Sequence, residues 1–189
     1  MNKTLQTFGL AALLAGIAMQ PTEAYGILKP RIKNSANNVN AYGVNVILFD
    51  EVITPNYVSR IIRKESSGNT KAIGTRGERG LMQLMPKTWV DESRRLCGEA
   101  LSFDLAFDPV ANKNVGTQYL RTIESYLSTK IEGWDKLTIE QKQDLIAAAY
   151  NGGMGNLWKK ARWDVSKMPA SVQFYVSQLA EWRTESGKP

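Results

Sequence analysis

The sequence predicts a predominantly all-α domain that is interrupted by an irregular, glycine-rich loop. Three features lead to this prediction. From Thr54 onward, apolar residues recur at the three- and four-residue spacing of amphipathic helices. Helix-start signals precede several of these stretches, and no alternation of apolar and polar residues reaches the length of a strand. We therefore expect helices throughout, with at most a small irregular β element in the glycine-rich loop.

Residues 1–24 have the features of a signal peptide. Lys3 supplies a positive charge, residues 8–19 form a run of apolar and small residues, and Thr22-Glu23-Ala24 offers a cleavage site. A membrane anchor is the alternative, but a spanning helix needs about 20 apolar residues. We therefore expect a protein exported to the periplasm or cell envelope, with no stable membrane insertion after cleavage.

The remaining chain divides into two parts. Residues 25–50 are polar and rich in asparagine, and they end in an apolar stretch, so we expect a leader whose last residues dock on the domain. Residues 51–185 carry the helical periodicity and are expected to form one domain. The 165 residues left after cleavage are enough for a hydrophobic core.

The first predicted helix starts at Pro55, because proline is tolerated in a first turn, and it places Val58, Ile61 and Ile62 on one face. The loop that follows is marked by four glycines, which are Gly68, Gly74, Gly77 and Gly80. A second helix is expected from about residue 86 to residue 96.

A third, longer helix is expected to start near Pro109. Its helical spacing predicts a buried face made of Val115, Tyr119, Leu120, Ile123, Tyr126 and Leu127. Thr138 and Gln141 form a capping box for the next helix, which Gly152 and Gly153 end.

Short helical material is expected near Leu157, and the last helix starts at Pro169. The apolar stripe of that helix contains Val172, Tyr175, Val176, Leu179 and Trp182. Tryptophans 134, 158, 163 and 182 could stack on sugars or pack in the core, and we expect packing for most of them.

Composition excludes several kinds of chemistry. The chain has no histidine, which excludes Ser-His-Asp and Cys-His catalytic machinery. It also argues strongly against a catalytic zinc site, because such sites nearly always contain histidine. Cys97 is the single cysteine, so it forms no intramolecular disulfide and is expected to be a small buried residue. Cleavage of glycosidic bonds, by contrast, needs only carboxyl groups, so the lack of histidine does not exclude it. This chemistry implies neither a metal nor an organic cofactor.

The net charge of +6 suits an acidic partner, and in the cell envelope the nearest polyanion is the cell wall. Nucleic acid is the other interpretation, but the basic residues are scattered and accompany no nucleic-acid-binding motif. Ordinary solvated surface charge explains them most simply, and no nucleic-acid partner is expected.

Glu65 is the candidate catalytic residue. It continues the apolar face of the first helix, and it falls in the last turn, where the helix dipole disfavours a carboxylate. Apolar surroundings act in the same direction, so both effects should keep the carboxyl group protonated near neutral pH, as a general acid requires. Position alone fits an exposed glutamate at a frayed helix end equally well.

A series of motifs in a fixed order distinguishes these interpretations. It comprises Glu65-Ser66, Asn69, Ala72, Gly77, Gly80-Leu81-Met82-Gln83-Leu84-Met85-Pro86, Phe107-Asp108-Pro109, Asn114-Val115-Gly116, Tyr119-Leu120, Ala149-Tyr150-Asn151-Gly152-Gly153, Pro169 and Tyr175-Val176. This series resembles the soluble lytic transglycosylase family over roughly residues 52–185. The resemblance implies a lysozyme-like helical catalytic domain.

The resemblance also implies roles for individual residues. Glu65 matches the family's catalytic glutamate, with Ser66 beside it in the substrate-binding motif. Gln83 and Met85 match positions that line the glycan groove, and a glutamine amide can donate to and accept from sugar groups. Tyr150 matches a tyrosine whose hydroxyl reaches the catalytic carboxyl, although a buried aromatic residue ending its helix is the simpler alternative. Asn151 is expected to shape the groove beside it.

Two positions depart from the family pattern. Nine residues after the glutamate, the family often has a serine near the reacting sugar, whereas this chain has Gly74 with Thr75 beside it. Thirteen residues after the glutamate, where a small residue is usual, this chain has Glu78. Goose-type lysozymes carry an acidic residue in the comparable loop, so Glu78 is a candidate second carboxylate.

The expected reaction is cleavage of the MurNAc-GlcNAc β-1,4 bond of peptidoglycan with formation of 1,6-anhydro-MurNAc ends. A hydrolytic muramidase that uses Glu65 and Glu78 is the nearest alternative, and it requires carboxyl groups about 6.5–9.5 Å apart. A non-catalytic wall-binding component of a secretion or conjugation apparatus is the alternative of another class. Glycan strands are the expected partner in every case, with a secretion or conjugation machine as a further candidate.

Overall fold

The computed structural model describes residues 49–185, so the expected signal peptide and all but the end of the expected leader lie outside the described residues. The α-helices are α2 (Pro55–Ser66), α3 (Pro86–Cys97), α4 (Pro109–Lys130), α5 (Ile139–Gly152), α6 (Met154–Lys159) and α7 (Ala170–Glu185). Short 3₁₀ helices span Phe103–Phe107, Trp134–Lys136 and Val165–Lys167. The predicted all-α class is confirmed for the described part of the chain.

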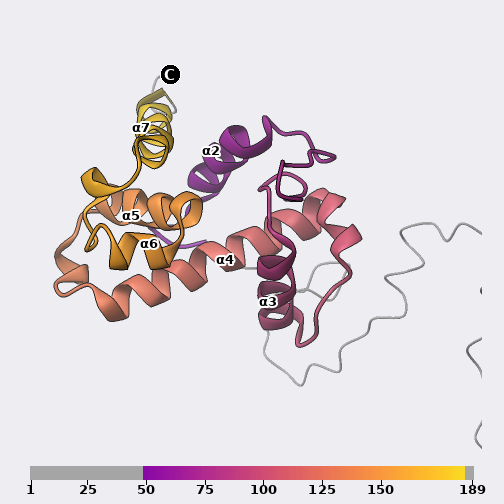
Figure 1. Ribbon diagram of the computed structural model, residues 1–189. Coiled ribbons are helices and arrows are strands. Elements are labelled where there is room, and N and C mark those ends of the chain that lie inside the picture. Colours follow the sequence, from indigo (N-terminus) through magenta and orange to yellow (C-terminus); the bar gives the residue numbers. More distant parts are fainter. Residues whose placement is uncertain (1–48, 186–189) are drawn as a thin grey trace, which may run out of the picture.

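The long helix α4 runs through the middle of the domain (Figure 1). Helices α5, α6 and α7 gather towards its C-terminal end, while α3 and the glycine-rich loop lie towards its N-terminal end. Helix α2 packs against α7, and its C-terminal end points towards the glycine-rich loop. This arrangement brings the end of α2 between the two groups of elements.

Local signals in the sequence explain where the main helices begin. The Thr54 hydroxyl accepts a hydrogen bond from the Tyr57 amide, and Asp108 caps α4 in the same way. The predicted capping box of α5 is present, because Thr138 and Gln141 bond each other's backbone amides. Ser67 caps the C-terminal end of α2: it has a left-handed φ of 52°, and its amide donates to the Arg63 carbonyl.

A buried polar network fixes α2 against its neighbours. The Arg60 guanidinium donates to the Leu179 carbonyl on α7 (2.5 Å) and to Gln143 Oε1 on α5 (2.9 Å). The Tyr57 hydroxyl donates to the Gln143 carbonyl (2.8 Å), and Gln143 Nε2 donates to the Val52 carbonyl (2.8 Å). Since buried polar groups are costly unless they are paired, this network favours one position of α2.

Asn112 on α4 holds the glycine-rich loop. Its side-chain amide donates to the Arg79 carbonyl (3.0 Å) and the Ala106 carbonyl (2.8 Å), and its oxygen accepts the Met82 amide (2.8 Å). Gly80 adopts φ +77°, and a side chain there would overlap the Ala106 carbonyl and Asn112. The expected small β element consists of isolated bridges that pair Arg79 with residues 73 and 84.

Some predicted core residues lie elsewhere. Tyr126 is 37% exposed, so its predicted burial is wrong, because its ring is only partly covered where Trp163 meets it edge-on at 6.5 Å. Tyr119 is only partly buried, as is Cys97, which ends α3. Trp134 is buried, as expected, but Trp158 is 41% exposed. No helix within residues 49–185 is both long enough and apolar enough to cross a membrane.

Candidate active site

A cleft of about 250 Å³ lies beside the C-terminal end of α2. It is lined by Glu65, Gly74, Thr75, Arg76, Glu78, Gln83, Leu84, Met85, Thr88, Tyr119, Tyr150 and Asn151. The structure thus brings together every sequence-predicted site residue except Ser66. The Ser66 hydroxyl instead donates to the Leu81 carbonyl (2.8 Å), where it ties the end of α2 to the glycine-rich loop.

The carboxyl group of Glu65 is largely removed from water. Burial raises its pKa to about 6, against the opposing effects of a hydrogen bond from Tyr175 and the charge of Lys64. The raised pKa agrees with the direction expected from the sequence. A pKa of about 6 leaves only a minority of the free protein protonated at pH 7, so protonation near neutral pH is less complete than expected.

The tyrosine that reaches Glu65 is Tyr175, not Tyr150. The Tyr175 hydroxyl, on α7, donates to Glu65 Oε1 (2.8 Å), while the Tyr150 hydroxyl donates to the Met82 carbonyl (2.5 Å). The expected role of Tyr150 is therefore corrected, because the nearby carbonyl in the glycine-rich loop takes its hydroxyl. Tyr150 still lines the cleft, and its ring packs on Tyr119 at 5.3 Å between centroids.

Gln83 is held in a specific orientation. Its φ of 45° is left-handed, which is unusual for a residue with a side chain and is common at functional sites. The Nε2 group donates to the Gly80 carbonyl (2.9 Å) and the Ala72 carbonyl (3.2 Å). These bonds use the donors inside the loop and direct the Oε1 acceptor towards Gly74, at the wall of the cleft.

Glu78 also lines the cleft, but its carboxylate is paired. Oε1 accepts from the Arg76 Nε (2.8 Å) and forms an ion pair with Nη2 (2.8 Å), and Oε2 accepts the Arg76 amide (2.9 Å). Burial would raise the pKa of this carboxyl, but these bonds, together with that from its own backbone, lower it below its usual value. Glu78 is therefore an ionised, fixed carboxylate.

The two departures from the family pattern are physically coupled. A side chain at position 74 would overlap Glu78 Oε2 and place its Cβ 2.9 Å from Gln83 Oε1. The Glu78 carboxylate therefore occupies the space that a serine at position 74 would need. Thr75 lines the same cleft, next to this carboxylate.

Metal binding requires clustered ligands. Within residues 49–185, no group of three or more Cys, Asp or Glu side chains is arranged to hold a metal ion. The cleft itself contains a carboxyl group with a raised pKa, a fixed carboxylate and hydrogen-bonding amides.

The comparisons with known proteins give the family. The model of the transglycosylase SLT domain matches residues 50–171, which is well over half of the chain. The chain belongs to this family. Among solved structures, the SLT domain resembles the 70 kDa soluble lytic transglycosylase SLT70 from Escherichia coli, with 26% identity and a TM-score of 0.56. It also resembles an inactive mutant of the lytic transglycosylase Slt from Pseudomonas aeruginosa, with 23% identity and a TM-score of 0.53.

Each of these matches covers 72% of this chain but only 22% of the solved chain. The SLT domain described here thus corresponds to about a fifth of either relative. The E. coli match supports the family assignment, and the P. aeruginosa match supports the helical fold. The predicted resemblance to the soluble lytic transglycosylases is confirmed.

Sequence reasoning assigned no role to two residues of this SLT domain that complete its site. Tyr175 was part of the recognised motif series, but its helical stripe suggested only core packing. Arg76 lies two residues before Glu78, and an arginine beside an acidic residue in a tight loop is a signal for a local ion pair. Both assignments needed the loop and α7 to be placed relative to α2.

Proposed function

We propose that this SLT domain is a peptidoglycan lytic transglycosylase that cleaves the MurNAc-GlcNAc β-1,4 bond and forms 1,6-anhydro-MurNAc ends. The observation that carries the proposal is the Glu65 carboxyl group. It lines a cleft, accepts a hydrogen bond from Tyr175, and has a pKa raised to about 6. A group with these properties can act first as an acid and then as a base.

In the proposed reaction, protonated Glu65 donates its proton to the glycosidic oxygen as the bond to C1 of MurNAc breaks. The transition state has oxocarbenium character. The Glu65 carboxylate then removes the proton from the C6 hydroxyl of the same sugar, and that oxygen attacks C1. Water is neither consumed nor released, and the intramolecular nucleophile makes a second carboxylate unnecessary. Substrate that fills the cleft would exclude water and raise the Glu65 pKa further.

Tyr175, Gln83 and Asn151 have supporting roles in this proposal. The Tyr175 hydroxyl stays a donor, since burial raises its pKa well above the usual range, and it orients Glu65. Gln83 Oε1 would accept from a sugar hydroxyl or N-acetyl N–H, while Met85 and Asn151 would contact the glycan along the cleft.

A hydrolytic muramidase is the second candidate, since Glu78 lines the same cleft as Glu65. To activate water, Glu78 would have to accept a proton. The bonds from Arg76 and the lowered pKa make it a poor base, so the lyase is favoured. A wall-binding component without catalysis is less well supported still, because the raised-pKa carboxyl and its donor are both present.

Export to the periplasm or cell envelope follows from the proposed substrate, because peptidoglycan lies outside the cytoplasmic membrane. The predicted signal peptide at residues 1–24 agrees with this location. Local opening of the wall for a secretion or conjugation machine is compatible with a small wall-cleaving domain.

Mass spectrometry of digested peptidoglycan tests the proposal. Anhydro products weigh one water less than reducing products, so the lyase and the hydrolase give different masses. We expect anhydro-muropeptides from the unchanged protein and none above background from Glu65→Gln. Reducing ends would replace the lyase with the muramidase, and wall binding without any released muropeptide would support the non-catalytic alternative.

A further inference from the structure

Three aromatic side chains form a platform outside the cleft. The rings of Trp158 and Trp163 stack at 5.0 Å with an interplanar angle of 27°, and Tyr126 meets Trp163 edge-on at 6.5 Å. Trp158 is 41% exposed and Tyr126 is 37% exposed. Large aromatic rings usually bury more of their surface, so this set, called the aromatic platform below, presents contact area to a ligand.

The backbone that presents Trp163 is in an unfavourable conformation. Arg162 and Trp163 have φ values of 51° and 66°, although neither is glycine. Residues with a side chain rarely adopt this left-handed backbone, because it brings Cβ too close to a backbone carbonyl oxygen. The turn is closed by hydrogen bonds from the Trp163 amide to the Leu157 carbonyl and from the Arg162 amide to the Trp158 carbonyl. Such conformations concentrate at functional sites, and here the turn brings one indole onto the other.

Positive charges border the aromatic platform. The Arg162 guanidinium lies 5.1 Å from the centre of the Trp158 ring, and Lys130 Nζ lies 5.8 Å from that of Tyr126. Lys159 and Lys160 are exposed beside Trp158 in the sequence. The acidic neighbour Asp164 is engaged by Ser166 and Lys167. The border therefore complements an anionic ligand.

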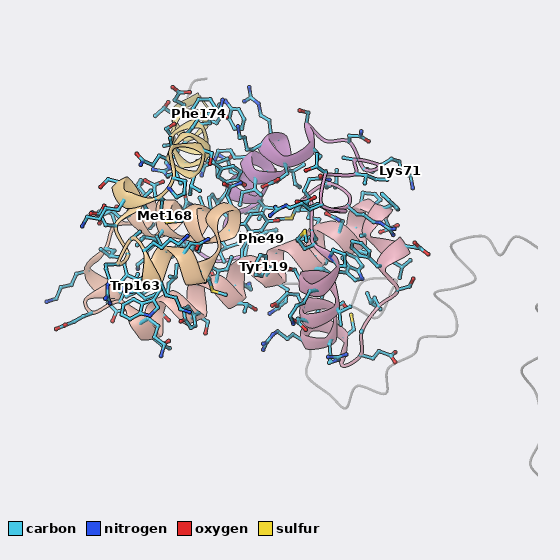
Figure 2. All side chains as sticks on the ribbon, viewed as in Figure 1. Phe49, Lys71, Tyr119, Trp163, Met168 and Phe174 are labelled. Atoms are coloured by element: carbon cyan, nitrogen blue, oxygen red, sulfur yellow. The ribbon has the colours of Figure 1, made fainter. Side chains whose placement is uncertain are left out.

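The aromatic platform continues the line of the cleft along α4. Tyr119 lines the cleft, and Tyr126 follows it by two helical turns, which places the two rings on the same side of α4 about 10 Å apart. Figure 2 shows Tyr119 near the middle of α4 and Trp163 where α6 lies beside the end of α4. Trp158 lies on the short helix α6, which starts at Met154, soon after Asn151 in the cleft.

We propose that the aromatic platform is a second glycan-binding surface, on which the same peptidoglycan strand continues beyond the cleft. The C–H faces of its sugar rings would stack on Trp158, Trp163 and Tyr126. Carboxylates of its stem peptides would face Lys130 and Arg162. This inference rests on the proposed substrate, because an anionic polysaccharide combines the flat apolar faces and the negative charges that the surface complements.

The test measures binding to insoluble peptidoglycan by sedimentation, with Glu65→Gln in every protein so that the wall is not digested. Adding Trp158→Ala should weaken binding roughly tenfold, as the loss of a central aromatic contact does. Adding Lys130→Gln should reduce the salt dependence of binding. Phe174→Ala is the matched control, since Phe174 is 59% exposed on α7 and lies far from Trp163, and it should leave binding unchanged (Figure 2).

Thermal unfolding by circular dichroism verifies that each variant is folded. Binding by the Trp158→Ala protein as tight as that of its parent would overturn the proposal, as would an equal loss with Phe174→Ala. Vesicles of phosphatidylglycerol and phosphatidylcholine provide the remaining arm. If Trp158→Ala abolishes binding to vesicles and leaves wall binding intact, the surface recognises lipid. Failure of the proposed enzymatic function would appear separately, as an absence of muropeptides released by the unchanged protein.

Discussion

The two carboxyl groups that face the cleft, Glu65 on α2 and Glu78 in the glycine-rich loop, are both poorly exposed but have opposite pKa shifts. The Glu65 carboxyl accepts a hydrogen bond from the Tyr175 hydroxyl, but burial has the larger effect on its pKa. Glu78 has a guanidinium and a backbone amide on its two oxygens, and these bonds outweigh burial. The comparison shows that partners, rather than burial alone, decide which carboxyl can carry a proton.

Neutralising each carboxyl in turn is the strongest test of this difference. Glu65→Gln should lower kcat on peptidoglycan about a thousandfold, because it removes the only proton donor in the proposed mechanism. Glu78→Gln should lower kcat less than about fivefold, because Glu78 has no proton to transfer. Release of soluble muropeptides measures both. Equal, large losses in the two variants would instead indicate a two-carboxylate hydrolase.

The pH profile sharpens the same contrast. A general acid must be protonated, so kcat/KM should fall about tenfold per pH unit as the pH rises above about 6, the pKa of Glu65 in the free protein. The negative charge of Glu78 contributes to that raised pKa, so Glu78→Gln should move this alkaline limb of the pH profile to lower pH. Initial rates across buffers of constant ionic strength measure the shift. A limb that moves to higher pH would contradict the assigned coupling.

Gly74→Ser tests whether Glu78 occupies the place of a side chain. The new Cβ would overlap Glu78 Oε2, so the carboxylate would have to leave its bonds to Arg76. We expect the free energy of unfolding to fall by about 2 kcal/mol, as the loss of a hydrogen bond to a charged group typically causes. The double variant Gly74→Ser with Glu78→Ala should recover much of this loss. Urea denaturation of the single and double variants measures the coupling, and strictly additive effects would disprove it.

The smallest expected effect is that of Glu65→Gln on the pH dependence of stability. The pKa of Glu65 is raised in the folded state, so its stabilising contribution is complete below pH 4 and is lost as the pH rises through about 6. Glutamine does not titrate, so Glu65→Gln should not lose this contribution. Between pH 4 and pH 8, its free energy of unfolding should therefore rise by about 1–2 kcal/mol relative to that of the unchanged protein. Urea denaturation of both proteins at pH 4 and pH 8 measures this change. If the difference between their free energies of unfolding is the same at the two pH values, Glu65 is solvated.

The sequence predicted the helices well because their signals are local. The Thr138–Gln141 capping box, the proline at position 55 and the glycines after Tyr150 act within a few residues, and each lies where it was expected. Glu65 became a candidate because its place on the apolar stripe and at the helix end are both visible in one segment. The motif series then distinguished it from an exposed glutamate and supplied the cleft residues on distant elements.

The parts that were missed depend on packing between distant elements. The hydroxyl that reaches Glu65 comes from Tyr175, 110 residues away, and no local rule distinguishes it from Tyr150. The burial of Tyr126 was overestimated because a helical stripe gives direction but not the width of the covering layer. The overlap between Gly74 and Glu78 likewise exists only once the loop has folded back on itself.

The most direct test of the account is an NMR titration of the side-chain carboxyl groups in protein labelled with ¹³C-glutamate, with Glu65→Gln and Glu78→Gln to assign the signals. The account predicts that Glu65 titrates with a pKa of about 6 and that Glu78 titrates below the usual range for glutamate. A Glu65 carboxyl that titrates like one exposed to solvent, or a Glu78 carboxyl that titrates above Glu65, would contradict it.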